Sequence, residues 1–173
     1  MERAQVDQVR VIVVMGVSAA GKTTAGRALS HALGWPFYEG DDYHSATNIA
    51  KMHRGEALTD TDRAPWLHDL CTVIAGVIER GEHAVLACSA LKRAYREALV
   101  PRGTPPGVVR FAFLDVPVDV LRKRLAERKG SFFNPALLDS QIATLEQPSD
   151  AVRIDGDAPV DNIVKDIREA LEV

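Results

Sequence analysis

GVSAAGKT, residues 16–23, is the stretch of this 173-residue chain that decides its fold. It fits the pattern G-x-x-x-x-G-K-[ST], a loop whose backbone N–H groups surround the phosphates of a nucleoside triphosphate. In such a loop the lysine, here Lys22, reaches the β- and γ-phosphates, and the hydroxyl of the next residue, Thr23, can bind Mg²⁺. The predicted nucleotide contacts are Gly16, Val17, Ser18, Ala19, Ala20, Gly21, Lys22, Thr23 and Thr24.

The segments on either side of the loop support this interpretation. The apolar, β-branched run 11–14 predicts a buried strand, and the apolar residues between Ala25 and Leu33 recur at helical spacing. An ordinary connection between a strand and a helix is the alternative. It gives no role to a lysine and a threonine directly after the last glycine.

Strand-like and helical patterns alternate along the rest of the chain. This alternation predicts an α/β fold with a parallel sheet covered by helices on both faces. We expect one domain over residues 1–173, because too little chain follows the turn-rich connection 101–107 for a second nucleotide-binding domain. The expected strands are 9–15, 36–39, 83–88, 109–114 and 151–154, and the expected helices are 22–33, 45–54, 62–80, 91–99, 117–127, 135–146 and 159–171.

Composition and charge narrow the possible partners. The formal net charge of −3 argues against nucleic acid or an anionic membrane surface as a partner. No apolar run approaches the roughly 20 residues of a membrane span. The two cysteines, Cys71 and Cys88, form no disulfide or metal-ligand pattern, so we expect a reduced, cytoplasmic setting.

Acidic residues follow the second expected strand, at Glu39, Asp41 and Asp42. Ligands of open α/β sheets bind at the carboxyl ends of the strands, so Asp41 is a candidate to orient an attacking hydroxyl and to accept its proton. Glu39 or Asp41 could also hold a water molecule of Mg²⁺. The alternative is that these acids only solubilise a loop and cap a helix, which is the role we assign to Asp42.

Two further groups of polar residues are candidates for binding a substrate. On a helix, His44, Asn48 and Lys51 would share one face and could grip a polyhydroxylated molecule; the alternative is a solvated polar face. Ser89 follows the third strand, and Lys92 and Arg96, four residues apart, could face one anion. We interpret Cys88 as a small buried residue rather than a nucleophile.

Arg63 stands in the first turn of the long expected helix 62–80, for which Thr61 or Asp62 is the expected N-cap. A cation there opposes the helix dipole, so Arg63 is expected to pair with an anion. That anion is Asp60, Asp62 or a substrate carboxylate, and we favour the substrate.

Basic residues also surround the end of the expected helix 117–127. Arg124 and Arg128 share one face, and Gly130 is expected to end the helix. In a small kinase, such a basic, glycine-containing hinge predicts a lid, here about residues 124–136, that closes over phosphates. A nucleic-acid patch or a solvated helix end is the alternative.

Together these segments resemble the gluconate kinase (gluconokinase) family of short P-loop kinases, which are related to shikimate and adenylate kinases. The most specific stretches are DTDRAPW at 60–66, CSALK at 88–92 and RKGSFF at 128–133. Two departures stand out. Ala19-Ala20 replaces the Gly-Ser often found in the family, and Glu39 replaces the usual Asp, which leaves its role toward Mg²⁺ open.

The resemblance implies a P-loop, shikimate-kinase-like three-layer fold with a small helical lid, and phosphorylation of D-gluconate at its 6-hydroxyl by ATP with Mg²⁺. Family members are often homodimers. The implied catalytic residues are Lys22, Asp41 and Arg128, Thr23 is the implied metal ligand, and Arg124 would stack on adenine. The implied substrate contacts are Asp41, His44, Lys51, Arg63, Ser89, Lys92, Arg96 and Gln141, with Arg63, Lys92 and Arg96 as a carboxylate clamp.

Three other functions remain open at this point. A sister kinase could act on another hydroxylated anion such as shikimate, although the 60–66 and 88–92 stretches argue against it. A regulatory module could bind nucleotide without catalysis, which the presence of Lys22, Thr23 and Asp41 disfavours. A P-loop protein acting on RNA or nucleosides would show strongly salt-dependent retention on nucleic acid.

Overall fold

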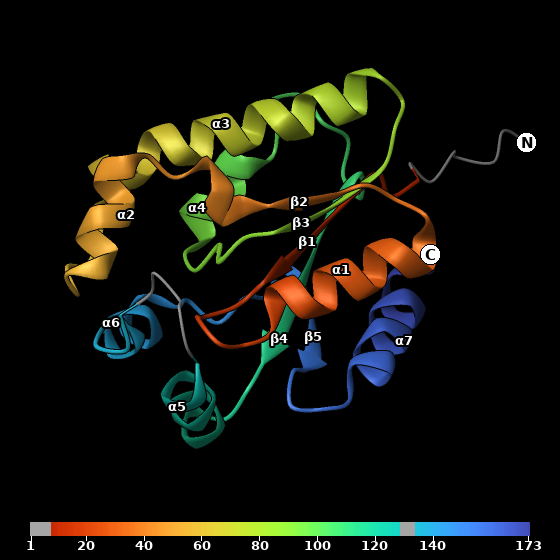
Figure 1. Ribbon diagram of the computed structural model, residues 1–173. Helices are drawn as coiled ribbons and strands as arrows, with labels where there is room; N and C mark the ends of the chain where they lie inside the picture. Colours follow the sequence, from red (N-terminus) through yellow and green to blue (C-terminus); the bar gives the residue numbers. More distant parts are fainter. Residues whose placement is uncertain (1–7, 129–133) are drawn as a thin grey trace, which may run out of the picture.

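The computed structural model describes residues 8–128 and 134–173. These residues form a five-stranded parallel sheet in the order β2-β3-β1-β4-β5 (Figure 1). The strands are β1 Val11–Met15, β2 Phe37–Glu39, β3 Ala84–Ala87, β4 Val109–Asp115 and β5 Ala151–Asp155. All five expected strands are thus confirmed, and so is the parallel arrangement.

β1 is the centre of the molecule, with Val13 paired to Leu86 of β3 on one side and to Phe111 of β4 on the other. Every residue of β1 is at most 1% exposed, which is why the strand is a continuous apolar run rather than an alternating one. Successive side chains point to opposite faces, so Ile12 and Val14 join one core cluster, and Val13 joins the other.

Helices cover both faces of the sheet, which confirms the expected three-layer fold (Figure 1). The cluster on one face contains buried residues of α1, α5, α6 and α7, and the cluster on the other contains those of α3 and α4. No helix in the described part of the chain is long and apolar enough to cross a membrane. The helices are α1 Lys22–Leu33, α2 Ala46–His53, α3 Asp60–Glu79, α4 Arg93–Leu99, α5 Val118–Glu127, α6 Leu137–Thr144 and α7 Val160–Leu171, with a 3₁₀ helix, η1, over Gly40–Tyr43.

The start of α3 differs from the prediction. Its N-cap is Thr59, not Thr61 or Asp62, because Thr59 and Asp62 form a reciprocal capping box. The Thr59 hydroxyl accepts from the Asp62 N–H at 3.1 Å, and the Asp62 carboxylate accepts from the Thr59 N–H at 2.9 Å. The contacts with Thr59, together with two bonds from the Lys51 ammonium, lower the pKa of Asp62 to about 2.

The end of α5 lies next to the predicted lid. The helix stops at Glu127, and Arg128 is its C-cap, so Gly130 does not end it. The lid predicted at about residues 124–136 includes 129–133, and these residues, Gly130 among them, lie outside the described part of the chain.

Candidate active site

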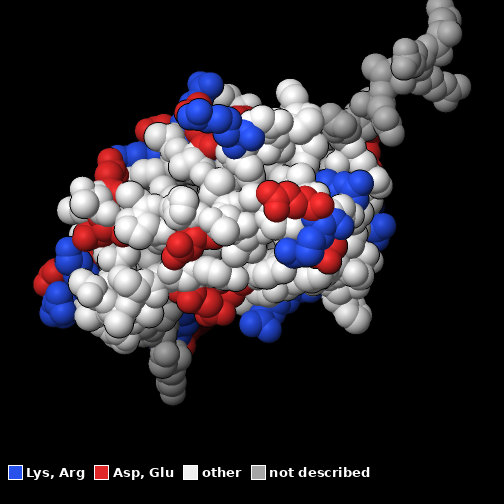
Figure 2. Space-filling model, turned by 90° about the horizontal axis from the view of Figure 1, so that it is seen from above, with Lys and Arg blue, Asp and Glu red and all other residues white. Residues whose placement is uncertain are grey.

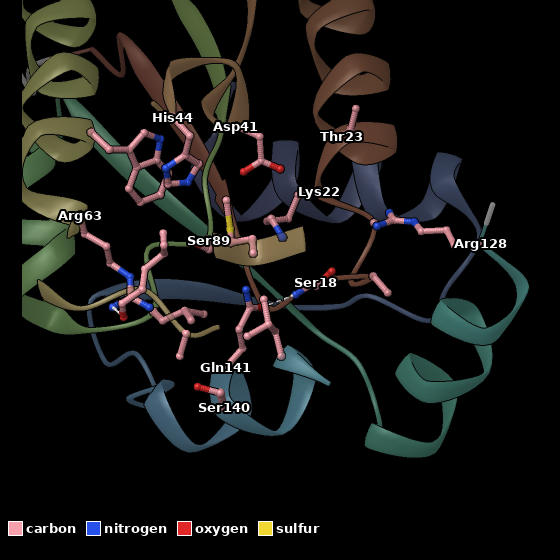
Figure 3. A pocket seen from close by; sticks show the side chains of 18 residues that line it. Ser18, Lys22, Thr23, Asp41, His44, Arg63, Ser89, Arg128, Ser140 and Gln141 are labelled. Atoms are coloured by element: carbon pink, nitrogen blue, oxygen red, sulfur yellow. Dashed lines mark hydrogen bonds between the residues drawn. The ribbon is translucent and has the colours of Figure 1, made fainter. Parts of the chain in front are cut away.

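A cavity opens where β1, β2 and β3 end, and the loops that follow these strands form much of its wall. Lys22 and Asp41 lie in its middle, with Arg63 on one side and Arg128 on the other (Figure 3). The cavity therefore brings together residues from the phosphate-loop motif, the acidic turn, the long helix and the end of α5.

The phosphate-loop motif connects β1 to α1. Gly21 is the N-cap of α1 and has a left-handed backbone, with φ of 93°, and Ala19 is also left-handed, with φ of 65°. The Lys22 ammonium donates to the carbonyl of Val17 at 3.0 Å. Burial lowers the pKa of Lys22, an effect that the nearby Asp41 carboxylate opposes. This loop has the form that binds phosphate at a helix N-terminus.

Asp41 lies in η1, directly after β2. Its backbone N–H donates to the Glu39 carboxylate at 3.4 Å. Burial raises the pKa of Asp41, while the positive charge of Lys22 works in the opposite direction. The side chain still reaches solvent through the cavity. A carboxylate with a raised pKa beside a lysine of the phosphate loop is suited to accept a proton.

Gly40 fixes the position of Asp41 against the sheet. A Cβ at this position would lie 2.4 Å from the carbonyl oxygen of Ala87 in β3. The Gly40 carbonyl also accepts from Nε1 of Trp66 at 2.8 Å. The turn can approach the sheet this closely only because residue 40 has no side chain.

Gly40→Ala is expected to lower the free energy of unfolding by about 1–3 kcal/mol through overpacking. It should also lower turnover, because η1 must move away from β3 and carries Asp41 with it. The matched control is Gly34→Ala, at a left-handed position with nothing within 4 Å, which should cost stability and leave turnover intact. Urea unfolding and steady-state kinetics measure both quantities, and equal turnover losses in the two variants would contradict the explanation.

The oxygen atoms around Thr23 fit a magnesium ion. The Thr23 hydroxyl donates to the Glu39 carboxylate, so two hard oxygen ligands lie together beside the phosphate loop. Within 8–128 and 134–173, no group of three or more His, Cys, Asp or Glu side chains could hold a metal. The Thr23 and Glu39 oxygens suit Mg²⁺, which is bound by one or two protein ligands together with phosphates and water.

The other side of the cavity carries Arg63, His44 and Ser89. The Arg63 guanidinium donates to the carbonyl of Leu58 at 2.8 Å and to the Tyr95 hydroxyl at 3.2 Å. Its distance to the Asp60 carboxylate is 3.8 Å. Asp60 is therefore one anion for Arg63, as one of the alternatives predicted, and the guanidinium also lines the cavity.

Gln141 reaches the cavity from α6 and contacts the phosphate loop itself. Its side-chain oxygen accepts from the backbone N–H of Ser18 at 2.7 Å (Figure 3). Its neighbour Ser140 also lines the cavity, and sequence reasoning missed it because nothing in the pattern of α6 shows which turn faces the loop.

The prediction that His44, Asn48 and Lys51 grip a substrate from one helix face is wrong. His44 precedes α2, which begins at Ala46, so it does not share a helix face with the other two. Lys51 pairs with the Asp62 carboxylate at 3.0 Å and does not line the cavity. Of the three residues, only His44 lines it.

The prediction that Lys92 and Arg96 face one anion is also wrong. Lys92 lies 3.6 Å from the Asp60 carboxylate, whereas Arg96 is 2% exposed and pairs with Asp150 at 3.0 Å. Neither lines the cavity, so the three-residue clamp with Arg63 is not assembled. Cys88 is buried as expected, and burial raises the pKa of its thiol to about 12.

A second hollow lies on the other side of the phosphate loop, and both Arg124 and Arg128 line it. Arg124 donates to the carbonyls of Ala19, at 3.2 Å, and of Gly156, also at 3.2 Å. Sequence reasoning missed Gly156, although it directly follows the last strand, where ligands of such sheets bind. Stacking of Arg124 on adenine stays a prediction.

Figure 2 shows the face that carries α3, where basic and acidic side chains are interspersed. This face presents no continuous basic stripe of the kind that binds nucleic acid.

The comparisons with known proteins agree with this geometry. An AAA domain family model matches residues 11–148. A protein of Xenopus tropicalis named "Probable gluconokinase" is 45% identical over 172 residues, covering 91% of this chain and 90% of that protein. The solved structure of a gluconokinase from Sinorhizobium meliloti 1021 has a TM-score of 0.80 at 42% identity, covering 94% of this chain and 91% of the other.

A shikimate kinase from Aquifex aeolicus shares the fold, with a TM-score of 0.55 at 22% identity and coverage of 94% of this chain and 96% of the other. The expectation of a shikimate-kinase-like fold is thus confirmed. Because the structure has a P-loop kinase cavity and a relative named as a probable gluconokinase is 45% identical over most of its length, the chain belongs to the gluconokinase family.

Proposed function

We propose that this enzyme transfers the γ-phosphoryl group of ATP to the 6-hydroxyl of D-gluconate, giving 6-phospho-D-gluconate and ADP. The observation that carries the proposal is one cavity lined by Lys22, Asp41 and, at its other side, the Arg63 guanidinium. Such a cavity can hold an acid with its carboxylate at one end and a hydroxyl at the other.

The reaction forms a bond between the substrate oxygen and the γ-phosphorus and breaks the bond to the β,γ-bridging oxygen. The hydroxyl proton goes to Asp41, and ADP leaves with the electron pair of the broken bond. Phosphoryl transfer has a loose transition state, so positioning and charge neutralisation provide most of the catalysis. Lys22 and the loop amides hold the phosphates, and Arg128, which lines both the cavity and the second hollow, neutralises developing charge.

Thr23 and Glu39 would hold Mg²⁺, which when bound neutralises charge on the β- and γ-phosphate oxygens. The hollow beside Arg124 is proposed to take adenine. Its lining is partly apolar and includes the side chains of Ala158 and Ile163. Such a wall suits the faces of a planar base.

At the substrate end, we assign the carboxylate of gluconate to Arg63 and its hydroxyls to His44, Ser89 and Gln141. Arg63 is already oriented by Leu58 and Tyr95, so little side-chain freedom is lost when it binds an anion. Gln141 has one amide oxygen committed to Ser18, which leaves its NH₂ group for the substrate.

The proposal also includes one catalytic domain over residues 1–173 with a lid at about 124–136, a cytoplasmic setting and a homodimeric assembly. The absence of a disulfide among the cysteines, Cys71 and Cys88, supports a reducing compartment. Sedimentation of the full chain tests the assembly.

A coupled ADP-release assay with Mg-ATP tests the function directly. The substrates are D-gluconate, shikimate, glycerate, a hexose and a nucleoside monophosphate. Turnover on gluconate alone is expected. Turnover on another substrate would keep the chemistry and reject the substrate assignment, and ATP binding without any turnover would support a regulatory module.

Arg63→Met is expected to raise KM for gluconate by about tenfold or more, because a charge-assisted hydrogen bond to the carboxylate is lost. KM for ATP should stay within about twofold. The matched control is Lys92→Met, which removes a neighbouring cation that does not line the cavity and should change KM for gluconate by less than about threefold. Equal increases in KM for the two variants would show that Lys92 also binds the substrate carboxylate, as the predicted clamp requires.

A further inference from the structure

The His44 ring is held on two sides. One face stacks on Trp66, with ring centroids 4.1 Å apart and 14° between the planes. Trp66 is itself anchored by its hydrogen bond to the Gly40 carbonyl. At the ring edge, Nδ1 of His44 lies 3.5 Å from the side-chain nitrogen of Asn48.

The Asn48 amide has one workable orientation. Asn48 is 5% exposed, and its Nδ2 donates to the backbone carbonyl of Asp62 at 2.9 Å. The reversed amide would place its oxygen against that carbonyl, and two acceptors would then face each other without a proton. Nδ2 carries a second hydrogen, which points toward His44, and it cannot accept. Nδ1 must therefore be the acceptor, and the proton of the neutral ring lies on Nε2.

Nε2 is the accessible ring nitrogen of a side chain that lines the cavity. Nε2 has no hydrogen-bond partner within residues 8–128 and 134–173. Every fully buried side-chain nitrogen or oxygen in those residues has a partner. Nε2 is therefore not fully buried and remains accessible. His44 lines the cavity and Asn48 does not. Burial, together with the positive charge of Arg63, lowers the pKa of His44 to about 4, so the ring is neutral at pH 7.

We propose that Asn48 is a positioning residue that holds His44 in its Nε2–H tautomer, so that His44 presents a hydrogen-bond donor to an oxygen atom of the sugar acid. The identity of the acceptor rests on the proposed function, whereas the tautomer does not. A donor at this position can donate to a hydroxyl or carboxylate oxygen, but not to an ammonium group, which has no acceptor. It therefore supports the preference for acids that Arg63 provides.

The direct test is ¹⁵N NMR of the ring nitrogens in the full-length protein at pH 7, with His44→Gln used to assign the signal. Nε2 is expected at the shift of a protonated nitrogen and Nδ1 at that of an unprotonated one. A protonated Nδ1 in the wild-type protein would overturn the inference, whether or not any variant folds. This result does not depend on turnover, so a lack of activity on gluconate would reject the proposed function alone.

Asn48→Ala should let the two tautomers mix and raise KM for gluconate by about fivefold, with kcat within about twofold. The matched control is Ser45→Ala, which removes the N-cap contact to the backbone N–H of Asn48 and leaves the amide in place. It loosens the same helix start and should change neither the ring signals nor KM. An unchanged tautomer in Asn48→Ala, or an equal rise in KM for Ser45→Ala, would contradict a positioning role.

Discussion

Asp41→Asn is expected to lower kcat by about 10²- to 10⁴-fold, the usual contribution of a positioned proton acceptor. The amide keeps the size of the side chain and can still contact the substrate hydroxyl, but it cannot take the proton. Binding of ATP should change by no more than about threefold, because the phosphates are held by Lys22 and the loop amides. Single-turnover kinetics and an ATP titration measure the two effects, and turnover within a few-fold of wild type would reject Asp41 as the proton acceptor.

The pH profile gives the same prediction a second readout. Burial raises the pKa of Asp41, and only its ionised form accepts a proton, so kcat/KM should fall as the pH decreases through that raised pKa. Asp42→Asn is the matched control, since Asp42 does not line the cavity and should leave kcat within about twofold. The negative charge of Asp42 raises the pKa of Asp41, so this variant should move the acidic limb to lower pH.

The change in the free energy of unfolding of Asp41→Asn distinguishes loss of the proton acceptor from misfolding. A carboxyl group whose pKa is raised on folding binds protons more readily when folded, so its ionisation destabilises the protein as the pH rises through that pKa. Removing the charge at pH 7 should leave the free energy of unfolding unchanged or raised. A variant that is inactive and at least as stable as the wild type is therefore the expected result. Loss of stability together with activity would point to a structural role.

The part of the site near the phosphates could be predicted from the sequence because it depends on strand ends. Lys22 and Asp41 each follow a strand of a parallel sheet, and the carboxyl ends of such strands meet at one edge. Apolar periodicity alone located β1 and α1, and the first and last residues of α1 agree with the expectation. Element ends were predicted less well: α3 begins at Asp60, after its N-cap Thr59, and not at residue 62, and α4 and α6 also begin two residues from their expected starts.

The substrate end could not be predicted in the same way, because helical spacing shows which residues share a face and not which residue lies opposite. Lys51 pairs with Asp62, which is 11 residues further along the chain. Arg96 pairs with Asp150, which is 54 residues further along. Ser45 provided a signal that was missed. It caps α2 through the N–H of Asn48, so the helix starts after His44.

Arg96→Met is expected to lower the free energy of unfolding by about 2–3 kcal/mol, because the buried carbonyl of Ala90 loses its donor and the partly exposed Asp150 loses a charge-assisted bond. Arg96 is 2% exposed, and its guanidinium donates to both oxygens of Asp150, each at 3.0 Å, and to the Ala90 carbonyl at 2.8 Å. Methionine fills a similar volume but satisfies neither acceptor. The matched control is Arg93→Met on the same helix, whose pair with Glu97 is exposed and should contribute less than about 1 kcal/mol.

The Arg96→Met substitution should also change the cavity, because Arg96 holds the segment that follows β3 in place. Ala90 is left-handed, with φ of 47°, a conformation that costs an alanine about 1 kcal/mol and that the bond to Arg96 helps to maintain. Its neighbour Ser89 lines the cavity, so relaxation at Ala90 displaces a proposed substrate contact. Arg96→Met should therefore raise KM for gluconate at temperatures where the variant is fully folded, and Arg93→Met should not.

If the free energy of unfolding of Arg96→Met lies within about 1 kcal/mol of the wild-type value, the ion pair does not hold this segment. A large stability loss with unchanged KM would instead confine the role of Arg96 to the core.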